Sequence, residues 1–300
     1  MSYPVGYRSL LVTDATLALT FPVVVLYPSA GPEQPEQLGP YELSLARAAE
    51  PAPGRFPVVL ISHGTGGSGL VYRTLAHFLA SQGFVVGLPE HPHNNRADDS
   101  WAQTPQNLTA RPRHLQLALD AVLHDSSLAP ATAPDAVALI GHSLGGYTAL
   151  ALAGGTPTTL PRESADGRPR LIPTPTDGRI RALVLLAPAT PWFRAPDTLC
   201  QIQVPVLLLT AEKDQHTGPW HAQNVLRGLP DPARVQHREV ANAGHFSFLS
   251  PFPAARVSRM FPPSQDPPGF DRAQFQQELQ AEVLTFLRAV LQPAEVQRGL

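Results

Sequence analysis

Sulfur and charge are both scarce in this sequence. The 300 residues include a single cysteine, Cys200, so no disulfide can form within the chain. Charged residues make up only 15% of the chain, with 22 basic and 24 acidic side chains and a formal net charge of −2. This balance gives no electrostatic reason to expect nucleic acid or an anionic membrane surface as a partner.

Long apolar runs are also missing. No stretch approaches the roughly 18 consecutive apolar residues that a membrane-spanning helix requires. The first six residues lack a basic segment followed by an apolar run, so the sequence predicts no signal peptide. We therefore expect a cytoplasmic protein without a membrane span, acting as a monomer or a small homo-oligomer.

Proline and glycine, by contrast, are abundant. The chain has 34 prolines and 22 glycines, which favour long, stiff loops between secondary-structure elements. Hydrophobic residues still make up 43% of the chain, enough for a substantial core. We expect one domain over residues 1–300, with Pro-rich insertions at about 94–111, 156–177 and 246–271 that are candidates for a partial lid.

Strands and helices are predicted to alternate from residue 56 onward. Apolar runs favour buried strands, and apolar residues at helical spacing favour the helices between them. Before residue 56 we expect a two-stranded hairpin, a loop over 28–40 and a short helix over 41–50. Pro112 is expected to be the first residue of a later helix. The pattern predicts the α/β class, with a mostly parallel central sheet of about eight strands and helices on both faces.

One motif stands at the centre of this predicted sheet. Residues 141–145 read Gly-His-Ser-Leu-Gly, after an apolar strand over 136–140 and before a helix that ends at Gly154 and Gly155. A strand, a sharp turn and a helix around a serine form the context of a nucleophile elbow. The two glycines are needed because a side chain at either place would collide in so tight a turn. Ser143 is therefore the candidate nucleophile.

A serine nucleophile needs a base, and the base needs a partner that orients it. In the elbow architecture the acid and then the histidine follow the serine along the chain. His245 comes directly after the last predicted strand, so we assign it as the base. Glu212 and Asp214 both follow the strand before. We favour Asp214, because it lies far enough beyond that strand to turn back toward His245.

The negative charge that develops on the substrate during attack needs two backbone amides as donors. We expect one from Leu144, which follows the nucleophile, and the other from Thr65 in the glycine-rich loop over 63–67. That loop fits neither common nucleotide-binding spacing, so no cofactor is expected. His63 and His142 flank the site and are expected to orient its loops through hydrogen bonds.

Other residues near the predicted strand ends have weaker assignments. Trp192 and Phe246 are candidates for lining an apolar substrate pocket, and ordinary core packing is the competing interpretation. His91 and His93 stand in a His-Pro-His run. No further ligand follows at a recognisable spacing, so no metal site is expected.

These motifs resemble the triad regions of the α/β-hydrolase superfamily, in the stretch around Ser143 and in Asp214 and His245. More narrowly, residues 56–67 and 80–86 are similar to the dienelactone-hydrolase-like group, which includes the platelet-activating-factor acetylhydrolases. The similarity extends from about residue 5 to the closing helix and is weak in the insertions.

Two departures from that group matter. Dienelactone hydrolases use a cysteine nucleophile, where this chain has Ser143. Plasma-type acetylhydrolases place the acid after the strand that follows the nucleophile, and residues 187–190 of this chain contain no carboxylate. The substrate of neither family is therefore carried over.

The resemblance implies a serine carboxylesterase, lipase-like, that cleaves small or medium-sized neutral esters through an acyl-enzyme. Amidase or peptidase, thioesterase and polyester hydrolase activities on the same triad are the alternatives. An aminopeptidase would need acidic side chains in its pocket, for which Glu90, Asp98 and Asp99 are the nearby candidates. A hydrolase-fold protein that binds a ligand without turnover is the alternative of another class. The intact set of serine, acid and histidine argues against it.

Overall fold

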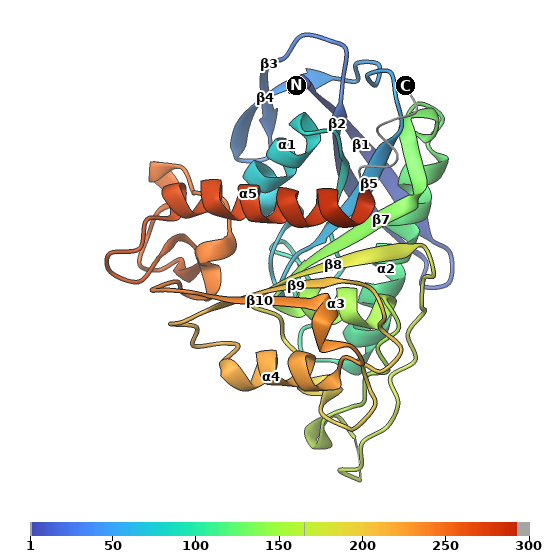
Figure 1. Ribbon diagram of the computed structural model, residues 1–300, viewed down its shortest axis with the longest axis vertical. Coiled ribbons are helices and arrows are strands. Elements are labelled where there is room, and N and C mark those ends of the chain that lie inside the picture. Colours follow the sequence, from blue (N-terminus) through green and yellow to red (C-terminus); the bar gives the residue numbers. More distant parts are fainter. Residues whose placement is uncertain (1, 165, 293–300) are drawn as a thin grey trace.

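A mixed β-sheet runs through this computed structural model, which describes residues 2–164 and 166–292 (Figure 1). Ten strands of the described chain lie in the order β10-β9-β8-β7-β5-β6-β2-β1-β4-β3. Neighbours from β10 to β6 are parallel, whereas β2 is antiparallel to both β6 and β1. The strands are β1 (Val5–Asp14), β2 (Leu19–Pro28), β3 (Gln34–Leu38), β4 (Tyr41–Arg47), β5 (Phe56–Ser62), β6 (Val85–Pro89), β7 (Thr132–His142), β8 (Ile180–Leu186), β9 (Val206–Ala211) and β10 (Val235–Val240).

The middle of the sheet is covered on both faces. Every residue of β5, β6 and β9 is buried, as parallel strands between two layers of helices require. Helices α1 and α5 pack on one face, and α2, α3 and α4 pack on the other. The predicted architecture is thus confirmed, with ten strands in place of about eight. The helices are α1 (Arg73–Ser81), α2 (Pro105–His124), α3 (Leu144–Leu152), α4 (Pro219–Gly228) and α5 (Arg272–Leu291).

The two additional strands correct the prediction for residues 28–50. The expected loop contains β3, and the expected short helix is β4, which pairs with β3 and with the start of β1. The side chains of Tyr41, Leu43 and Leu45 face inward while the residues between them are exposed. This alternation has the period of a strand, and it prevails over the helix-compatible composition of the segment.

The start of α2 is a second correction, because the helix begins at Pro105 and Pro112 lies inside it. The Thr104 hydroxyl caps the helix by accepting a hydrogen bond of 3.2 Å from the Asn107 amide. Pro112 has no N–H to give to the carbonyl of Leu108, four residues earlier. The Tyr147 hydroxyl of α3 donates to that carbonyl instead, at 3.0 Å. A residue distant in sequence therefore satisfies the carbonyl that Pro112 leaves open inside the helix. Local sequence rules alone predict this proline at a helix start.

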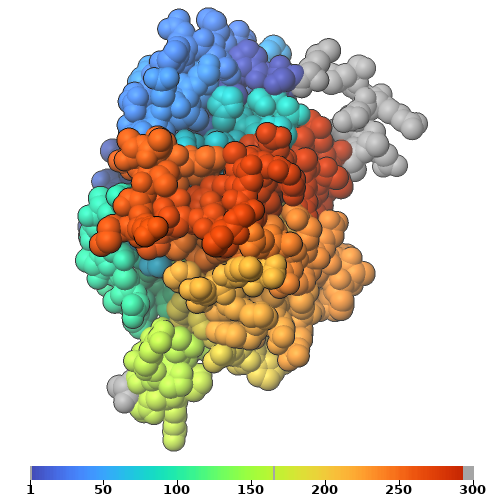
Figure 2. Space-filling view, turned by 90° about the vertical axis from the view of Figure 1, so that its left-hand side faces the viewer, coloured from blue at the N-terminus to red at the C-terminus, as the bar shows by residue number. Residues whose placement is uncertain are grey.

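The three predicted insertions take different positions. The first is partly helical, because α2 begins within it. The second, over residues 156–177, projects in yellow-green from the lower end of the molecule in Figure 2. The third, over residues 246–271, lies in orange across the middle of the same view, below the blue N-terminal strands. Residues of the first and third line the cavity described below, and the described residues of the second do not.

Candidate active site

The turn between β7 and α3 holds Ser143 in a strained backbone conformation. Its φ of 54° and ψ of −121° lie in a region that residues other than glycine rarely adopt. The Ser143 amide donates a 3.1 Å hydrogen bond to the carbonyl of Leu186 in β8. A Cβ on Gly141 would lie 2.3 Å from the carbonyl oxygen of Gly145, and one on Gly145 would lie 1.9 Å from that of Ser62. Close backbone packing therefore explains both glycines of the motif.

His245 and Asp214 meet beside this turn. Asp214 follows β9, and its Oδ2 lies 2.8 Å from Nδ1 of His245. The same oxygen accepts a 2.7 Å bond from the Thr217 hydroxyl, and Oδ1 accepts bonds from two backbone amides. Burial alone would raise the Asp214 pKa. The hydrogen bond and charge of His245 and the bonds from Thr217 outweigh burial and hold that pKa well below its usual range.

Glu212, the alternative acid, has a different position. Its Oε2 accepts a 2.7 Å hydrogen bond from the Asn242 amide, so it ties the loop after β9 to the loop after β10. The Glu212 residue is exposed, whereas the Asp214 side chain is only 2% exposed. Among these two acids, it is Asp214 that the structure brings to His245.

A series of buried hydrogen bonds fixes the backbone of His245. His142 Nε2 donates a 2.9 Å hydrogen bond to the His245 carbonyl oxygen, and Nδ1 of His142 lies 2.8 Å from the Tyr72 hydroxyl. Burial lowers the pKa of His142 to about 3, so its ring is neutral and carries one proton. A carbonyl only accepts, so that proton is on Nε2, and Tyr72 donates to Nδ1. The predicted loop-orienting hydrogen bond of His142 is confirmed.

The glycine-rich loop after β5 lies against Ser143. A Cβ on Gly64 would be 3.1 Å from the Ser143 Cβ. Thr65 lines the same cavity as Ser143, and its hydroxyl accepts a 2.9 Å bond from the Asn94 side chain. Within the described part of the chain, neither the Thr65 amide nor the Leu144 amide donates a hydrogen bond. Both N–H groups therefore lack an acceptor among the described residues.

A buried arginine, Arg111, stabilises this loop through hydrogen bonds. Arg111 of α2 bonds through its guanidinium to the carbonyl of His63, to Oδ1 of Asn94 at 2.6 Å and to the Thr148 hydroxyl at 3.0 Å. Burial lowers the Arg111 pKa to about 9, which leaves the group charged at neutral pH. Since Asn94 also bonds to Thr65, Arg111 is joined to the loop at two places.

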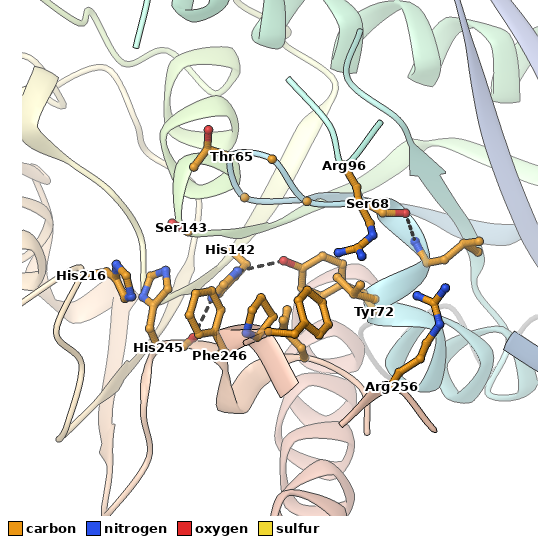
Figure 3. A pocket seen from close by; sticks show the side chains of 18 of the residues that line it. Thr65, Ser68, Tyr72, Arg96, His142, Ser143, His216, His245, Phe246 and Arg256 are labelled. Atoms are coloured by element: carbon orange, nitrogen blue, oxygen red, sulfur yellow. Dashed lines mark hydrogen bonds between the residues drawn. The ribbon is translucent and has the colours of Figure 1, made fainter. Parts of the chain in front are cut away.

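One cavity of about 330 Å³ brings several of these residues together (Figure 3). This volume suits a small or medium-sized ligand. Ser143 and His245 lie at one end of it, with His216 beside them. The wall is mainly apolar and aromatic. Its lining side chains include Tyr41, Leu70, Val71, Tyr72, Phe246, Leu249 and Phe261.

The two residues predicted to line the pocket, Phe246 and Trp192, lie in different places. Phe246 lines the cavity, and its ring lies 5.1 Å from that of His245. Trp192 does not line it. Its ring is buried 4.9 Å from that of Tyr147, and its indole N–H donates to Glu163 at 3.0 Å. Trp192 thus packs in the core and anchors the insertion over residues 156–177.

Sequence reasoning missed Tyr72, Asn94 and Arg111. Their partners lie tens of residues away along the chain, and no local motif marks them. An arginine among apolar residues on one face of α2 was the available signal, because a charge on a buried face requires a partner inside the protein.

Among the described residues, no group of three or more His, Cys, Asp and Glu side chains is arranged to hold a metal ion. His91 Nε2 lies 2.9 Å from the Ser62 hydroxyl, and His93 Nδ1 lies 2.6 Å from Asp98. No helix in the described chain has the length and apolar character to cross a membrane.

Two comparisons with known proteins found similarities, one to a segment of the sequence and one to the fold. The chlorophyllase family model matches residues 33–164, a segment that contains Thr65 and Ser143 and ends before Asp214 and His245. A ferulic acid esterase from Streptomyces cinnamoneus superimposes with a TM-score of 0.70 and 21% sequence identity, over 97% of this chain and 91% of that one. Among curated proteins, none matches the chain significantly.

The structural likeness establishes the α/β-hydrolase fold. The family match covers the nucleophile elbow and less than half of the chain. Of the solved structures, 881 chains match, and such widely shared folds host many activities. The substrate must therefore be argued from the cavity.

Proposed function

We propose that the protein hydrolyses small or medium-sized carboxylic esters through Ser143, His245 and Asp214. One observation carries the proposal. Ser143 stands at a strained elbow in the same cavity as His245, whose Nδ1 is held by the buried Asp214 carboxylate. A strained residue at a turn is retained where function requires it, and an oriented imidazole is what a serine nucleophile needs.

The first half of the reaction forms an acyl-enzyme. Ser143 Oγ attacks the ester carbonyl carbon while Nε2 of His245 accepts the hydroxyl proton. Asp214 keeps Nδ1 of His245 protonated and stabilises the imidazolium that results. The carbonyl oxygen becomes negative and receives hydrogen bonds from the amides of Leu144 and Thr65. His245 then gives its proton to the departing alcohol oxygen, and the carbon–oxygen bond breaks.

The second half releases the acid. Water attacks the acyl-enzyme carbonyl carbon while His245 Nε2 takes a proton from it. The second tetrahedral intermediate uses the same two amides. It collapses as His245 returns the proton to Ser143 Oγ, which leaves the carboxylic acid product and the free enzyme.

The lining of the cavity favours neutral or acidic esters over the substrates of an aminopeptidase. No Asp or Glu lines it among the described residues. Glu90 bonds to the Gly69 amide, Asp98 to His93, and Asp99 to the Asn94 side chain. A substrate ammonium group would therefore find no acidic partner in the cavity. The cytoplasmic location and the monomeric or small homo-oligomeric state stay predictions.

Hydrolysis of a chain-length series of p-nitrophenyl esters tests this function. Methyl ferulate belongs in the same panel, because a ferulic acid esterase shares the fold. We expect turnover by the wild-type protein, loss of turnover in Ser143→Ala, and a fluorophosphonate label located on Ser143 by mass spectrometry. The acyl chain length with the highest kcat/KM would indicate the length of acyl group that the cavity accommodates.

A matched serine variant separates chemistry from folding. Ser126 is a serine that does not line the catalytic cavity, so Ser126→Ala should keep both turnover and label. A folded wild-type protein that neither hydrolyses the panel nor takes the label would contradict the proposal and favour a ligand-binding protein without turnover.

A further inference from the structure

Two guanidinium groups stand at the end of the cavity away from Ser143. Arg96 and Arg256 both line the cavity, and Figure 3 shows them across from the end that holds Ser143 and His245. Arg96 belongs to the loop between β6 and α2, and Arg256 belongs to the segment over residues 246–271. Two segments far apart in sequence therefore bring positive charge to one place.

Neither arginine is neutralised by the protein. Within residues 2–164 and 166–292, no ion pair joins either guanidinium to an acidic side chain. Each lies over an aromatic ring instead, with Cζ of Arg96 4.7 Å from the Phe261 centroid and Cζ of Arg256 5.9 Å from the Tyr41 centroid. Such contacts hold a guanidinium in place without cancelling its charge.

A third cation adds to the positive potential at this end. Arg73 is 8% exposed, and its Cζ lies 3.8 Å from the Tyr41 centroid, so the same ring contacts both Arg73 and Arg256. Its guanidinium bonds to the carbonyl of Pro251. Glu90, whose carboxylate accepts a hydrogen bond from the Gly69 amide, does not line the cavity, and burial raises its pKa.

We propose that this end of the cavity binds an oxyanion carried by the substrate, in particular a carboxylate. The preferred ester then has an apolar or aromatic body with the ester bond at one end and a carboxylate at the other. The body would lie along Phe246 and Phe261, and Arg96 and Arg256 would bind the carboxylate. The proposal rests on the proposed function, because it places the ester carbonyl at Ser143.

The two arginines would prefer a carboxylate because the substrate replaces water around them. Arg96 is exposed and Arg256 half-buried, so water solvates both while the cavity is empty. A ligand body that packs against the apolar wall displaces some of this water and lowers the local dielectric constant. The attraction between a guanidinium and a carboxylate then becomes stronger. The planar guanidinium also matches the two oxygens of a carboxylate. A neutral group at the same position would leave the arginines without that partner.

Paired ester substrates test the inference. One series consists of p-nitrophenyl monoesters of dicarboxylic acids, each compared with the same ester capped as its methyl ester. The second carries the carboxylate on the alcohol side, as acetates of hydroxy acids compared with their methyl esters. In one series at least, we expect the anionic member to have a kcat/KM about tenfold higher, with the advantage shrinking at high salt. The series that shows it identifies the side of the ester that carries the carboxylate.

Arginine variants assign the effect to the two residues. Arg96→Ala and Arg256→Ala should each lower the ratio of anionic to neutral turnover, and the double variant should abolish the preference. Arg259→Ala is the matched control, because Arg259 is an exposed arginine of the same segment that does not line the cavity. It changes the net charge equally and should keep the ratio.

A binding measurement that needs no turnover separates this inference from the proposed function. By calorimetry, phenylbutyrate should bind wild type about tenfold more tightly than phenylbutyramide, and the double variant should lose this difference. Equal binding of the two ligands, or a preference that survives in the double variant, would overturn the anion site. Binding without any ester turnover would leave the anion site standing and refute the proposed function instead.

Discussion

Nε2 of His142 donates a 2.9 Å hydrogen bond to the main-chain carbonyl of His245. The two imidazole rings lie close, with centroids 4.8 Å apart. Because His142 is neutral, its ring fixes the backbone of His245 without placing a second positive charge beside a base that must itself become charged. Since Tyr72 fixes the ring of His142, the position of the proposed base depends on a hydroxyl in the 3₁₀ turn that precedes α1.

Replacing Tyr72 by Phe should weaken both stability and catalysis. The variant leaves the buried Nδ1 of His142 without a donor, which costs about 1–3 kcal/mol of unfolding free energy. We expect kcat to fall about tenfold as His245 loses its fixed position, with a smaller change in KM. Urea denaturation and p-nitrophenyl acetate kinetics measure the two effects.

Tyr27→Phe is the matched control. The Tyr27 hydroxyl also donates one hydrogen bond from a buried ring, at 2.7 Å to the Ala49 carbonyl, and it does not line the cavity. Its removal should lower stability but not kcat. An equal loss of kcat in both variants would show that Tyr72 acts through global stability alone.

Asp214→Asn distinguishes the two acids that follow β9. An amide at this position donates where the carboxylate accepted, so Nδ1 of His245 is no longer held protonated. We expect kcat to fall about 10⁴-fold while the fold is retained. Glu212→Gln should leave kcat nearly unchanged, because a glutamine carbonyl can still accept from the Asn242 amide. A larger loss in Glu212→Gln than in Asp214→Asn would reverse the assignment.

The elbow was predictable because its requirements are local. Two backbone segments meet within a few residues of Ser143, and only glycine fits at Gly141 and Gly145. The chain order of acid and histidine, together with the strand ends, was enough to predict that Asp214 lies beside His245. Parallel strands place their carboxyl ends at one edge of a sheet, so residues far apart in sequence meet there without any contact having to be known.

The errors arise where tertiary contacts decide the outcome. Pro112 follows a rule for helix starts, and the rule fails because Tyr147 satisfies the carbonyl that the proline leaves open. Residues 41–47 contain good helix formers, yet pairing with β1 and β3 makes them a strand. Trp192 follows a strand end like Phe246, but packing against Tyr147 takes it into the core. Composition and spacing contain no information about these partners.

The buried histidine His114 predicts a loss of stability in mild acid. Both of its ring nitrogens are buried without a hydrogen-bond partner in the described structure, and burial lowers its pKa to about 4. The unfolded chain, with a histidine pKa near ~6.5, binds a proton that the folded state does not. Its contribution to stability is thus complete above about pH 6.5 and is lost as the pH falls toward 4.

His114→Leu should remove this acid sensitivity. The variant is expected to be as stable as wild type at pH 7, or more so, because an unsatisfied polar ring is replaced by an apolar side chain. Between pH 7 and pH 5, wild type should lose about 2 kcal/mol more than the variant. Urea denaturation at both pH values measures the difference, and parallel losses in the two proteins would show that His114 does not titrate in this way.

Asn94 is the residue through which Arg111 reaches the proposed oxyanion loop. Its Oδ1 accepts from Arg111 at 2.6 Å, and its Nδ2 donates to the Thr65 hydroxyl at 2.9 Å. Asn94→Ala removes both bonds, together with the bond from Nδ2 to Asp99, and leaves the Thr65 amide less well oriented toward the developing negative charge. We expect kcat to fall roughly 10–100-fold with little change in KM, since the amide is needed most in the transition state.

Asn224→Ala controls for the loss of an asparagine side chain. Asn224 donates to the carbonyl and hydroxyl of Thr190 at 3.1 and 3.2 Å, and it does not line the cavity. Its replacement should keep kcat near the wild-type value even if it lowers the denaturation midpoint. The contrast is decisive when both variants are assayed well below their unfolding transitions, because a kcat defect that remains in Asn94→Ala alone then comes from the geometry of the loop. A KM increase at constant kcat in Asn94→Ala would instead mean that the loop binds the ground state and the transition state equally, and Thr65 would lose its proposed role.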